Sequence, residues 1–268
     1  MTTFDPTTMP AAKARLEGLR GGFFTSDLSI DEFAVLHQHG FRPLGMVMGS
    51  SVYHIGLQAT RWSQSQELTV LTQAMHSARE LALSRMVHEA QQLGADGVVA
   101  TRAELQAYVG GEHELEFISV GTAVRFESAP GSLALGPQKV PFTSALSGQD
   151  MVKLWRLGFV PVHFAFGVCV YHVAHQSLRQ SLRQIGQNVE MPLYTQAVYD
   201  ARELALGRLQ TEAQQWGGTG LVGTTLDVRS HLWGEHAVEF LAAGTAVRPH
   251  GQDVTPFAQP TPTLSFDA

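Results

Sequence analysis

Apolar residues recur at helical spacing in two long segments of the chain, residues 67–93 and 192–216. At about 100° per residue, the side chains that share one stripe are Leu71, Met75, Ala78, Ala82, Met86 and Leu93 in the first segment, and Tyr194, Val198, Ala201, Ala205, Leu209 and Trp216 in the second. Gly94 and Gly217 follow the segments and favour helix ends, and Pro192 suits a first helical turn. The pattern therefore predicts two long amphipathic helices.

Shorter patterns predict a helix and three strands around each long helix. Ser29 and Glu32 form a capping box that opens a helix ending at Gly40. Runs of β-forming residues separated by turns predict strands at 42–53, 97–109 and 112–126 in the first half, and at 160–173, 220–232 and 235–248 in the second. The predicted fold class is α+β, with two tandem αβ-αββ units, each with a long helix packed on a small, mainly antiparallel sheet. Because a three-stranded sheet with helices on one face stays open, we expect the units to pair or to oligomerise.

The two halves of the chain are copies of one unit. The motifs Phe24-Thr25-Ser26, Tyr53-His54, 78–83, 89–92, Gly111-Glu112-His113 and 121–125 recur in the same order as Phe142-Thr143-Ser144, Tyr171-His172, 201–206, 212–215, Gly234-Glu235-His236 and 244–248. From the repeat and the turn-rich stretch between its copies we predict an N-terminal extension (1–22), a first unit (23–127), a linker (128–140), a second unit (141–249) and a flexible tail (250–268).

Composition narrows the class of protein. The formal net charge of −6 and the pI of about 6.0 argue against nucleic acid or an acidic membrane as a partner. No apolar run reaches the roughly 18 residues of a membrane span, and the N-terminus lacks the pattern of a secretory signal. The single cysteine, Cys169, excludes an internal disulfide and a cysteine-cluster zinc site, and we expect it to be a small core side chain. These features predict a cytoplasmic protein.

The repeated unit resembles the YbjQ-like family. The resemblance rests on the order strand, long helix with Ala-Arg-Glu-Leu-Ala-Leu (78–83), Leu-Gly-Ala-Asp-Gly-Val-Val (93–99), hairpin and Gly-Thr-Ala-Val (121–124), and it covers residues 41–126 and 159–248. The second copy departs from it, since Trp-Gly-Gly-Thr-Gly (216–220) replaces the Leu-Gly-Ala-Asp-Gly stretch. The family consists of small bacterial proteins usually labelled "putative heavy-metal-binding". The resemblance implies a dodecin-like βαββ subunit that assembles into homo-oligomeric rings, typically pentamers.

Two histidine positions occur in both copies and are the better candidates for ligands, because imidazole binds transition metals well. His113 and His236 follow Glu112 and Glu235 at the mouths of the predicted hairpins, where the four side chains could form metal sites. The alternative is that each histidine packs with apolar neighbours on its strand face and uses one hydrogen bond. The pairs Tyr53-His54 and Tyr171-His172 end the first strand of each unit, where they could bind a ligand or tie the following loop to the sheet.

Charged side chains interrupt the apolar stripe of both long helices. Glu89 and Glu212 lie close to its centre, and the arginines at its edges are Arg79, Arg85, Arg202 and Arg208. A carboxylate on an apolar stripe needs a partner, because an unpaired buried charge is costly. Two interpretations remain open: an Arg–Glu pair across a subunit or unit interface, and a polar pocket in the lumen of a ring.

The sequence contains no nucleophile elbow, phosphate-binding loop or Rossmann fingerprint, and no Ser/His/Asp set is repeated. We therefore predict a non-enzymatic, ring-forming binding or scaffold protein whose ligand could be a divalent transition metal or a small molecule. The alternatives are a metal-dependent enzyme that uses the histidine and glutamate at the hairpin mouths, and a protein-interaction module whose tails recruit partners.

Two ring arrangements are compatible with a duplicated chain. Five chains could make two stacked rings with one kind of repeat in each. Both repeats could instead alternate in one ring, which requires an even number of units and departs from a five-membered ring.

Overall fold

The computed structural model describes residues 5–54, 64–107, 114–173, 190–230 and 237–250, and its fold is α+β with a repeated unit, as predicted. A 3-10 helix η1 (Pro6–Thr8) and α1 (Pro10–Arg20) come first. The elements of the two units are α2 (Ile30–Gln38), β1 (Phe41–His54), β2 (Gln66–Glu67), α3 (Thr69–Gln92), β3 (Gly97–Ala107) and β4 (Glu114–Phe126), then β5 (Phe142–Thr143), α4 (Gly148–Arg156), β6 (Phe159–His172), α6 (Pro192–Gln215), β7 (Gly220–Ser230) and β8 (Ala237–Pro249). Matched helices and strands have equal lengths, so the residues of these elements can be compared position by position.

The helix ends follow the local signals in the sequence. The capping box is present, with Ser29 N donating to Glu32 Oε2 at 2.8 Å and Glu32 N donating to Ser29 Oγ at 3.3 Å. Gly94 and Gly217 lie beyond the two long helices with φ of +68° and +77°, a conformation that glycine adopts without strain. Within the described ranges, none of the helices is both long and apolar enough to cross a membrane.

The two sheets exchange edge strands between the units. The strand order is β1-β4-β3-β5 in sheet A and β2-β6-β8-β7 in sheet B. The short strand β5 comes from the second unit and pairs in parallel with β3, whereas β2 comes from the first unit and pairs antiparallel with β6. The sequence analysis predicted three strands per unit and missed both short strands. Each sheet therefore has a fourth strand that the other unit supplies.

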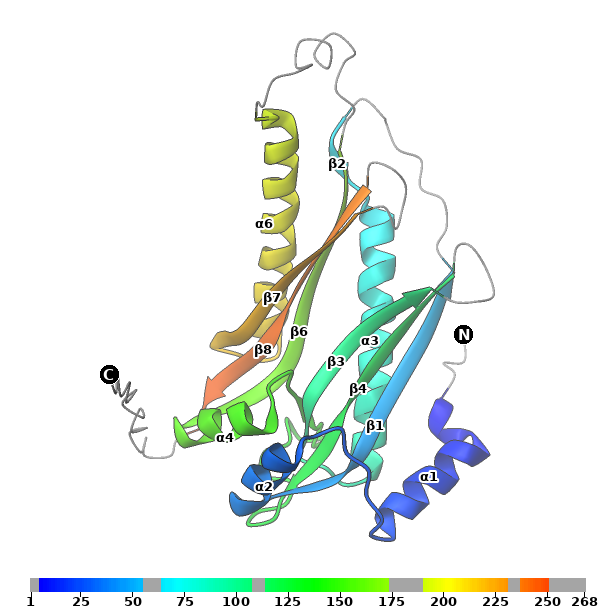
Figure 1. Cartoon of the computed structure of the whole chain (residues 1–268), viewed down its shortest axis with the longest axis vertical. Helices are drawn as coiled ribbons and strands as arrows, with labels where there is room; N and C mark the ends of the chain where they lie inside the picture. The colour runs from blue at the N-terminus through cyan, green and yellow to red at the C-terminus, as the bar shows by residue number, and fades with distance from the viewer. Residues whose placement is uncertain (1–4, 55–63, 108–113, 174–189, 231–236, 251–268) are drawn as a thin grey trace, which may run out of the picture.

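The elements form four layers: sheet A, α3, sheet B and α6 (Figure 1). One apolar core joins the side of sheet A that faces α3, the helix itself and the facing side of β6, including Val47, Met86, Phe117, Phe166 and Val170. A second core fills the space between the other face of sheet B and α6. Every residue of β6 except Phe159 is buried as a result. Within the second unit the long helix α6 packs on one face of sheet B, and α3 of the first unit covers the other face, so the two units pair as expected for such an open sheet.

A glycine in the first strand of each unit lets the long helix approach the sheet closely. A Cβ atom on Gly49 would overlap the carbonyl oxygen of Ala82 in α3, and one on Gly167 would overlap that of Ala205 in α6. Only a residue without a side chain fits at this distance. The close approach brings the charged side chains of each helix within reach of the strand's peptide groups.

Candidate functional site

The junction between the two units is formed by α3 and the face of β6 that it covers. Thr72 Oγ1 accepts a hydrogen bond of 2.9 Å from Val170 N, and Leu68 N donates to Val170 O at 2.8 Å. The ring of His76 packs on that of Phe166, with 5.2 Å between centroids. The helix thus binds the sheet of its own unit with one face and the sheet of the other unit with the opposite face.

A buried ion pair crosses this junction. Arg79 Nη2 lies 2.5 Å from Glu239 Oε1, and the two side chains are 4% and 0% exposed. The guanidinium also lies over the ring of Phe117, with Cζ 5.1 Å from the centroid. Burial lowers the pKa of Arg79 below its ordinary value, and the charge of Glu239 opposes that shift. Since arginine stays protonated in proteins, the junction holds two opposite charges away from water.

The partner of Arg79 was missed in the sequence. Arg79 was singled out there, but Glu239 was not, although Glu116 and Glu239 occupy matched positions just before Phe117 and Phe240. That repetition on strands β4 and β8 was the available signal. The interpretation of an ion pair across a unit interface therefore describes Arg79, but with a glutamate from a strand and not from a long helix.

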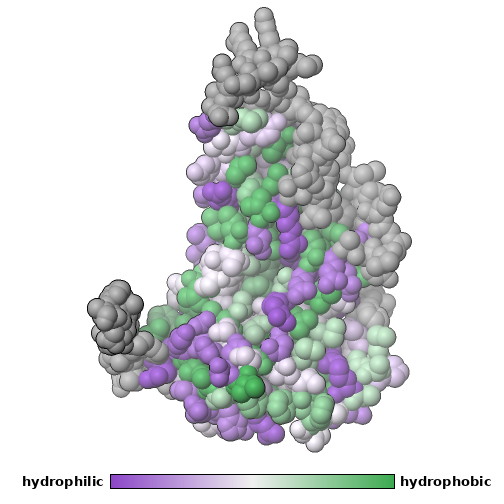
Figure 2. Space-filling model, viewed as in Figure 1, coloured by the Kyte–Doolittle hydropathy of each residue, from purple (hydrophilic) through white to green (hydrophobic). Residues whose placement is uncertain are grey.

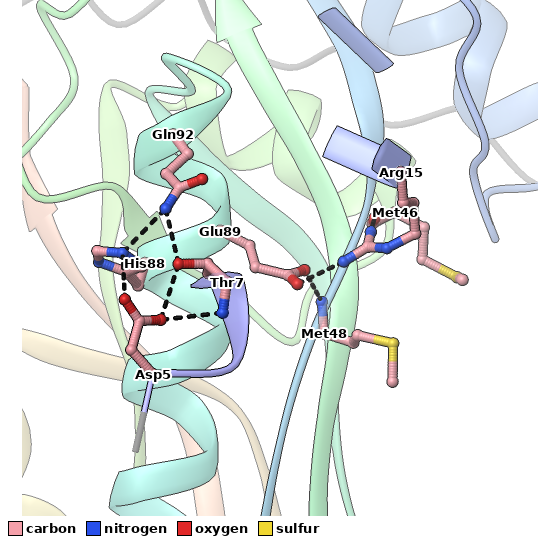
Figure 3. Close-up of polar contacts among 8 residues, drawn as sticks. All are labelled: Asp5, Thr7, Arg15, Met46, Met48, His88, Glu89 and Gln92. Carbon is pink, nitrogen blue, oxygen red and sulfur yellow. Dashed lines mark hydrogen bonds and ion pairs between the residues drawn. The ribbon is translucent and has the colours of Figure 1, made fainter. Parts of the chain in front are cut away.

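The glutamates of the long helices bind peptide groups of the nearest strand. Glu89 Oε2 accepts from Met48 N at 2.9 Å, and its other oxygen pairs with Arg15 of α1, which also donates to Met46 O at 3.0 Å (Figure 3). Glu212 Oε2 accepts from Phe166 N at 3.0 Å. Such bonds satisfy strand N–H groups that the ladder leaves unpaired.

The second unit uses different partners for the same glutamate. His163 Nε2 lies 3.1 Å from Glu212 Oε1, and the histidine ring stacks on Trp216 with 4.2 Å between centroids. Arg15 has no counterpart there, since the extension precedes the first unit only. The two repeats therefore differ where the N-terminal extension binds.

Arg85 and Arg208 complete this pattern on the strand carbonyls. Arg85 Nη1 donates to Ser50 O at 2.6 Å, and Arg208 Nη1 donates to Val168 O at 2.7 Å. Arg208 also pairs with Glu67 of β2, at 2.7 Å, and the hydrogen bond to Glu67 raises the pKa of Arg208. Arg208 thereby binds β2, the strand that the first unit contributes to sheet B.

The N-terminal extension is held by the last turns of α3. Asp5 accepts hydrogen bonds from Thr7 that lower the pKa of its carboxyl group, and Gln92 Nε2 donates to Thr7 Oγ1 at 2.9 Å (Figure 3). His88 Nε2 lies 3.8 Å from Asp5 Oδ2. The contact covers the C-terminal part of α3 beside Glu89.

Replacing Glu89 tests whether this polar contact is structural. We expect Glu89→Leu to lower the free energy of unfolding by about 2 kcal/mol, because Met48 N and Arg15 lose their acceptor. Chemical denaturation with a tryptophan fluorescence readout measures the change. Glu80→Leu, an exposed position on the same helix, is the control and should be neutral. Equal stabilities of the two variants would contradict the assignment.

The Tyr-His pairs lie at strand ends with different surroundings. Tyr171 and His172 are buried, and they pair with Glu67 and Gln66 of β2. At the matched end of β1, Tyr53 is half-buried and His54 is exposed. The remaining candidate arginine, Arg202, lies on α6 with its Cζ atom 5.2 Å from the centroid of the Tyr199 ring. The Tyr171-His172 pair therefore lies where the second unit receives β2 from the first unit.

The predicted metal ligands Glu112, His113, Glu235 and His236 lie outside the described residues. Among the residues that are described, no group of three or more histidine, cysteine, aspartate or glutamate side chains could hold a metal ion. The hairpin-mouth sites therefore stay a prediction.

A polar groove of about 490 Å³ lies between α3 and α6, lined among others by His76, Glu80, Glu212 and Trp216.

Cys169, in the strand between these helices, is fully buried as predicted. Burial raises the pKa of its thiol to about 12, so the sulfur stays protonated at neutral pH and is a poor nucleophile.

Comparison of the sequence with known proteins identifies a family and several relatives. The profile of a family described as "Putative heavy-metal-binding" (YbjQ_1) matches residues 28–127 and 163–250. The encapsulin nanocompartment protein Rv1762c of Mycobacterium tuberculosis is 52% identical over 250 residues, which are 92% of this chain and 94% of that protein. UPF0145 proteins match about one unit: that of Methanococcus maripaludis is 37% identical (32% of this chain, 80% of that protein), and that of Thermus thermophilus is 38% identical (32% and 78%). No solved structure gives a significant match.

Proposed function

Because the chain belongs to the YbjQ-like family and carries the family's unit twice, we propose that it is a non-enzymatic scaffold protein that assembles with copies of itself. One observation carries this proposal: both surfaces that meet at the internal junction recur, uncovered, at the two ends of the layered chain.

The first uncovered surface is the outer face of sheet A. In sheet B the matching face is covered by α3, which buries Phe166 and Val170 of β6. Their counterparts in β1 are Met48 and Val52, which are 42% and 49% exposed. Two large apolar side chains on one strand face, with a covered equivalent in the same chain, support an interaction surface.

The second uncovered surface is the side of α6 that points away from sheet B, where the counterparts of Leu68 and His76 are Met191 and Tyr199. These side chains are 37% and 55% exposed. In the view of Figure 2, apolar side chains reach the surface among polar ones over sheet B and α6.

Charge complementarity links the two surfaces. The counterparts of Arg79 and Glu239 are Arg202 on α6 and Glu116 on β4. Arg202 Nε is buried without a hydrogen-bond partner, and neither residue forms an ion pair within the part of the chain that the structure describes. Glu116 lies opposite Val52 in the register of sheet A, so it shares the open face. A second copy whose sheet A packs on α6 would bring Arg202 and Glu116 together, as the internal junction does for Arg79 and Glu239.

Such a contact joins two different surfaces, so it builds a closed ring or a continuing filament. The resemblance to the family favours a ring. The predicted number of five chains belongs to stacked rings of like repeats, whereas a contact between α6 and sheet A makes both repeats alternate in one ring with an even number of units. The similarity to an encapsulin nanocompartment protein supports a role as a component of a protein compartment in the cytoplasm. A bound metal ion or small ligand belongs to the same proposal, through the family description and the histidines at the hairpin mouths.

Native mass spectrometry of the untagged protein tests the assembly. We expect masses that are multiples of the 29.1-kDa chain, and any excess mass would reveal a bound metal or small molecule. A monomer at micromolar concentration would overturn the proposal. Metal-dependent turnover that is lost in His113→Ala would contradict its non-enzymatic part.

A charge on α6 should separate assembly from folding. We expect Tyr199→Asp to weaken self-association about 100-fold, equivalent to roughly 3 kcal/mol, because the carboxylate would be buried against a neighbouring sheet. The same change at Val70, which is 64% exposed on α3, is the matched control. Sedimentation velocity over a concentration series measures both. An equal effect of the two substitutions would contradict a specific surface on α6.

A further inference from the structure

The short strand β5 of the second unit pairs in parallel with β3 of the first unit. Backbone hydrogen bonds run in both directions between the two units. Phe142 N donates to Asp96 O at 3.0 Å, and Ser144 N donates to Val98 O at 2.9 Å. In return, Thr101 N donates to Ser144 O at 2.8 Å. The short segment therefore completes the outer edge of sheet A.

A glycine forms the socket for the aromatic ring of this strand. Phe142 is fully buried, and a Cβ atom on its register partner Gly97 would overlap the phenylalanine ring. The fit combines strand addition, which supplies backbone bonds, with one anchoring side chain.

The same segment exists in the first unit, where it pairs with no strand among the described residues. Phe24-Thr25-Ser26 repeats Phe142-Thr143-Ser144, and Phe24 is 48% exposed. The serine is anchored in its own unit in the same way in both copies: Ser26 Oγ lies 3.3 Å from Thr122 Oγ1, and Ser144 Oγ lies 3.5 Å from Thr245 Oγ1. The first-unit segment is thus held at its serine, while the Phe24 ring stacks on Phe33 and stays about half exposed.

The matching socket lies on β7 and is open. Gly220 is the counterpart of Gly97, and the nearest atom to a Cβ placed there is Val247 Cγ2, at 3.8 Å. Residues 220–224 are exposed or half-exposed, whereas all of 97–101 except the half-buried Ala100 are buried. Ala100 and Gly223 share a positive φ, at 52° and 62°, and the register shifts at the same place in β3 and β7, so both strands have the same irregularity.

We infer that residues 24–26 of one copy add in parallel to β7 of another copy, with the Phe24 ring over Gly220. This inference rests on the proposed self-assembly and names its geometry. An unpaired strand edge can pair with a further strand through its free peptide groups. The edge of β7 matches that of β3, which already pairs with the repeated segment in β5. The consequence is that the first unit of each copy follows the second unit of its neighbour. Both repeats then alternate along one ring or filament, and stacked rings of like repeats are excluded.

The test is a double-cysteine variant of the full chain, Thr25→Cys/Leu221→Cys, which matches the register pair Thr143 and Val98 and leaves Phe24 and Gly220 unchanged. Register partners on neighbouring strands have Cα atoms roughly 5 Å apart, which suits a disulfide. Oxidised glutathione is the oxidant: each pair of thiols forms one S–S bond, and the glutathione disulfide is reduced to two thiols. We expect covalent multimers on a non-reducing gel that return to single chains on reduction.

The control is Thr25→Cys/Val228→Cys, which moves the second cysteine along the exposed part of β7. It should remain a single chain on the gel. The native Cys169 is fully buried and should not react in either variant.

The outcomes separate this inference from the proposed function. A wild-type oligomer without the 25–221 cross-link would overturn the inference and leave self-assembly standing. A wild-type monomer would overturn self-assembly itself. As a second measurement, Gly220→Val should weaken self-association about tenfold or more without lowering the unfolding midpoint of the isolated chain, because the single chain has room for the side chain. An unchanged oligomer in that variant would also overturn the inference.

Discussion

Arg79→Ala is expected to lower the free energy of unfolding by about 3–5 kcal/mol. The substitution leaves the carboxylate of Glu239 buried between α3 and sheet B, with a side chain that is 0% exposed and no opposite charge beside it. It also removes the guanidinium from the ring of Phe117. Denaturation in guanidinium chloride, followed by circular dichroism at low protein concentration, measures the loss.

The double variant Arg79→Met/Glu239→Leu separates the charge effect from packing. A buried ion pair can be replaced by apolar residues of similar size with little change in stability, so we expect most of the lost stability to return. If the double variant were as unstable as Arg79→Ala, the loss would come from packing and not from the unpaired carboxylate.

Arg202→Ala provides the matched comparison on the other helix. Arg202 occupies the same position in α6 but forms no ion pair among the described residues, so the single chain should lose less than about 1 kcal/mol. Self-association should weaken instead, because a neighbouring copy would lose the partner of its Glu116. An equally large loss of stability in the single chain would contradict the distinction between closed and open junctions.

The sequence predicts the helices that are long enough to show a periodic pattern of apolar residues. Both long helices and the capping box at Ser29 follow from residue spacing and local side-chain bonds, and the structure confirms them. The repeat also predicts that matched residues lie at matched places. Helix spacing and capping depend only on neighbouring residues, and the repeat is visible in one sequence, so a single sequence is enough to predict these features.

The contacts between the units could not be predicted in the same way. The strands β2 and β5 have two residues each, which is too short for any alternation to appear. A helical wheel places Arg79 at the edge of an apolar stripe but cannot name a partner far away in the sequence. For the same reason, the sequence identified Glu89 as a residue that needs a partner, yet Arg15 emerged only from the packing of α1.

A related limit applies to the two faces of α3. The apolar stripe identified from the sequence faces sheet A, through residues such as Met75 and Ala82. The opposite face contacts sheet B through Thr72, His76 and Arg79, which look like an ordinary solvated side. Polar residues that are matched to a second surface are hard to distinguish from solvent-exposed ones without the fold.

Phe142→Ala is the second substitution with a large expected effect. The ring is fully buried against Gly97, inside a cluster that includes Leu36, Phe41 and Met151. Removing a buried phenylalanine ring typically costs about 3–5 kcal/mol, because the transfer free energy of the ring is lost and a cavity remains. Differential scanning calorimetry should show a single transition shifted to lower temperature.

Phe24→Ala is the same change at the matched position and should behave differently. The Phe24 side chain is 48% exposed and stacks on Phe33, with 5.4 Å between centroids, so the single chain should lose less than about 1 kcal/mol. If Phe24 binds β7 of a neighbouring copy, the variant should instead dissociate at protein concentrations where the wild type stays assembled. A large loss of stability in the single chain would show that Phe24 already supports its own unit. If the expected results are obtained, the phenylalanine at position 142 stabilises the single chain, and the phenylalanine at position 24 joins copies of the chain.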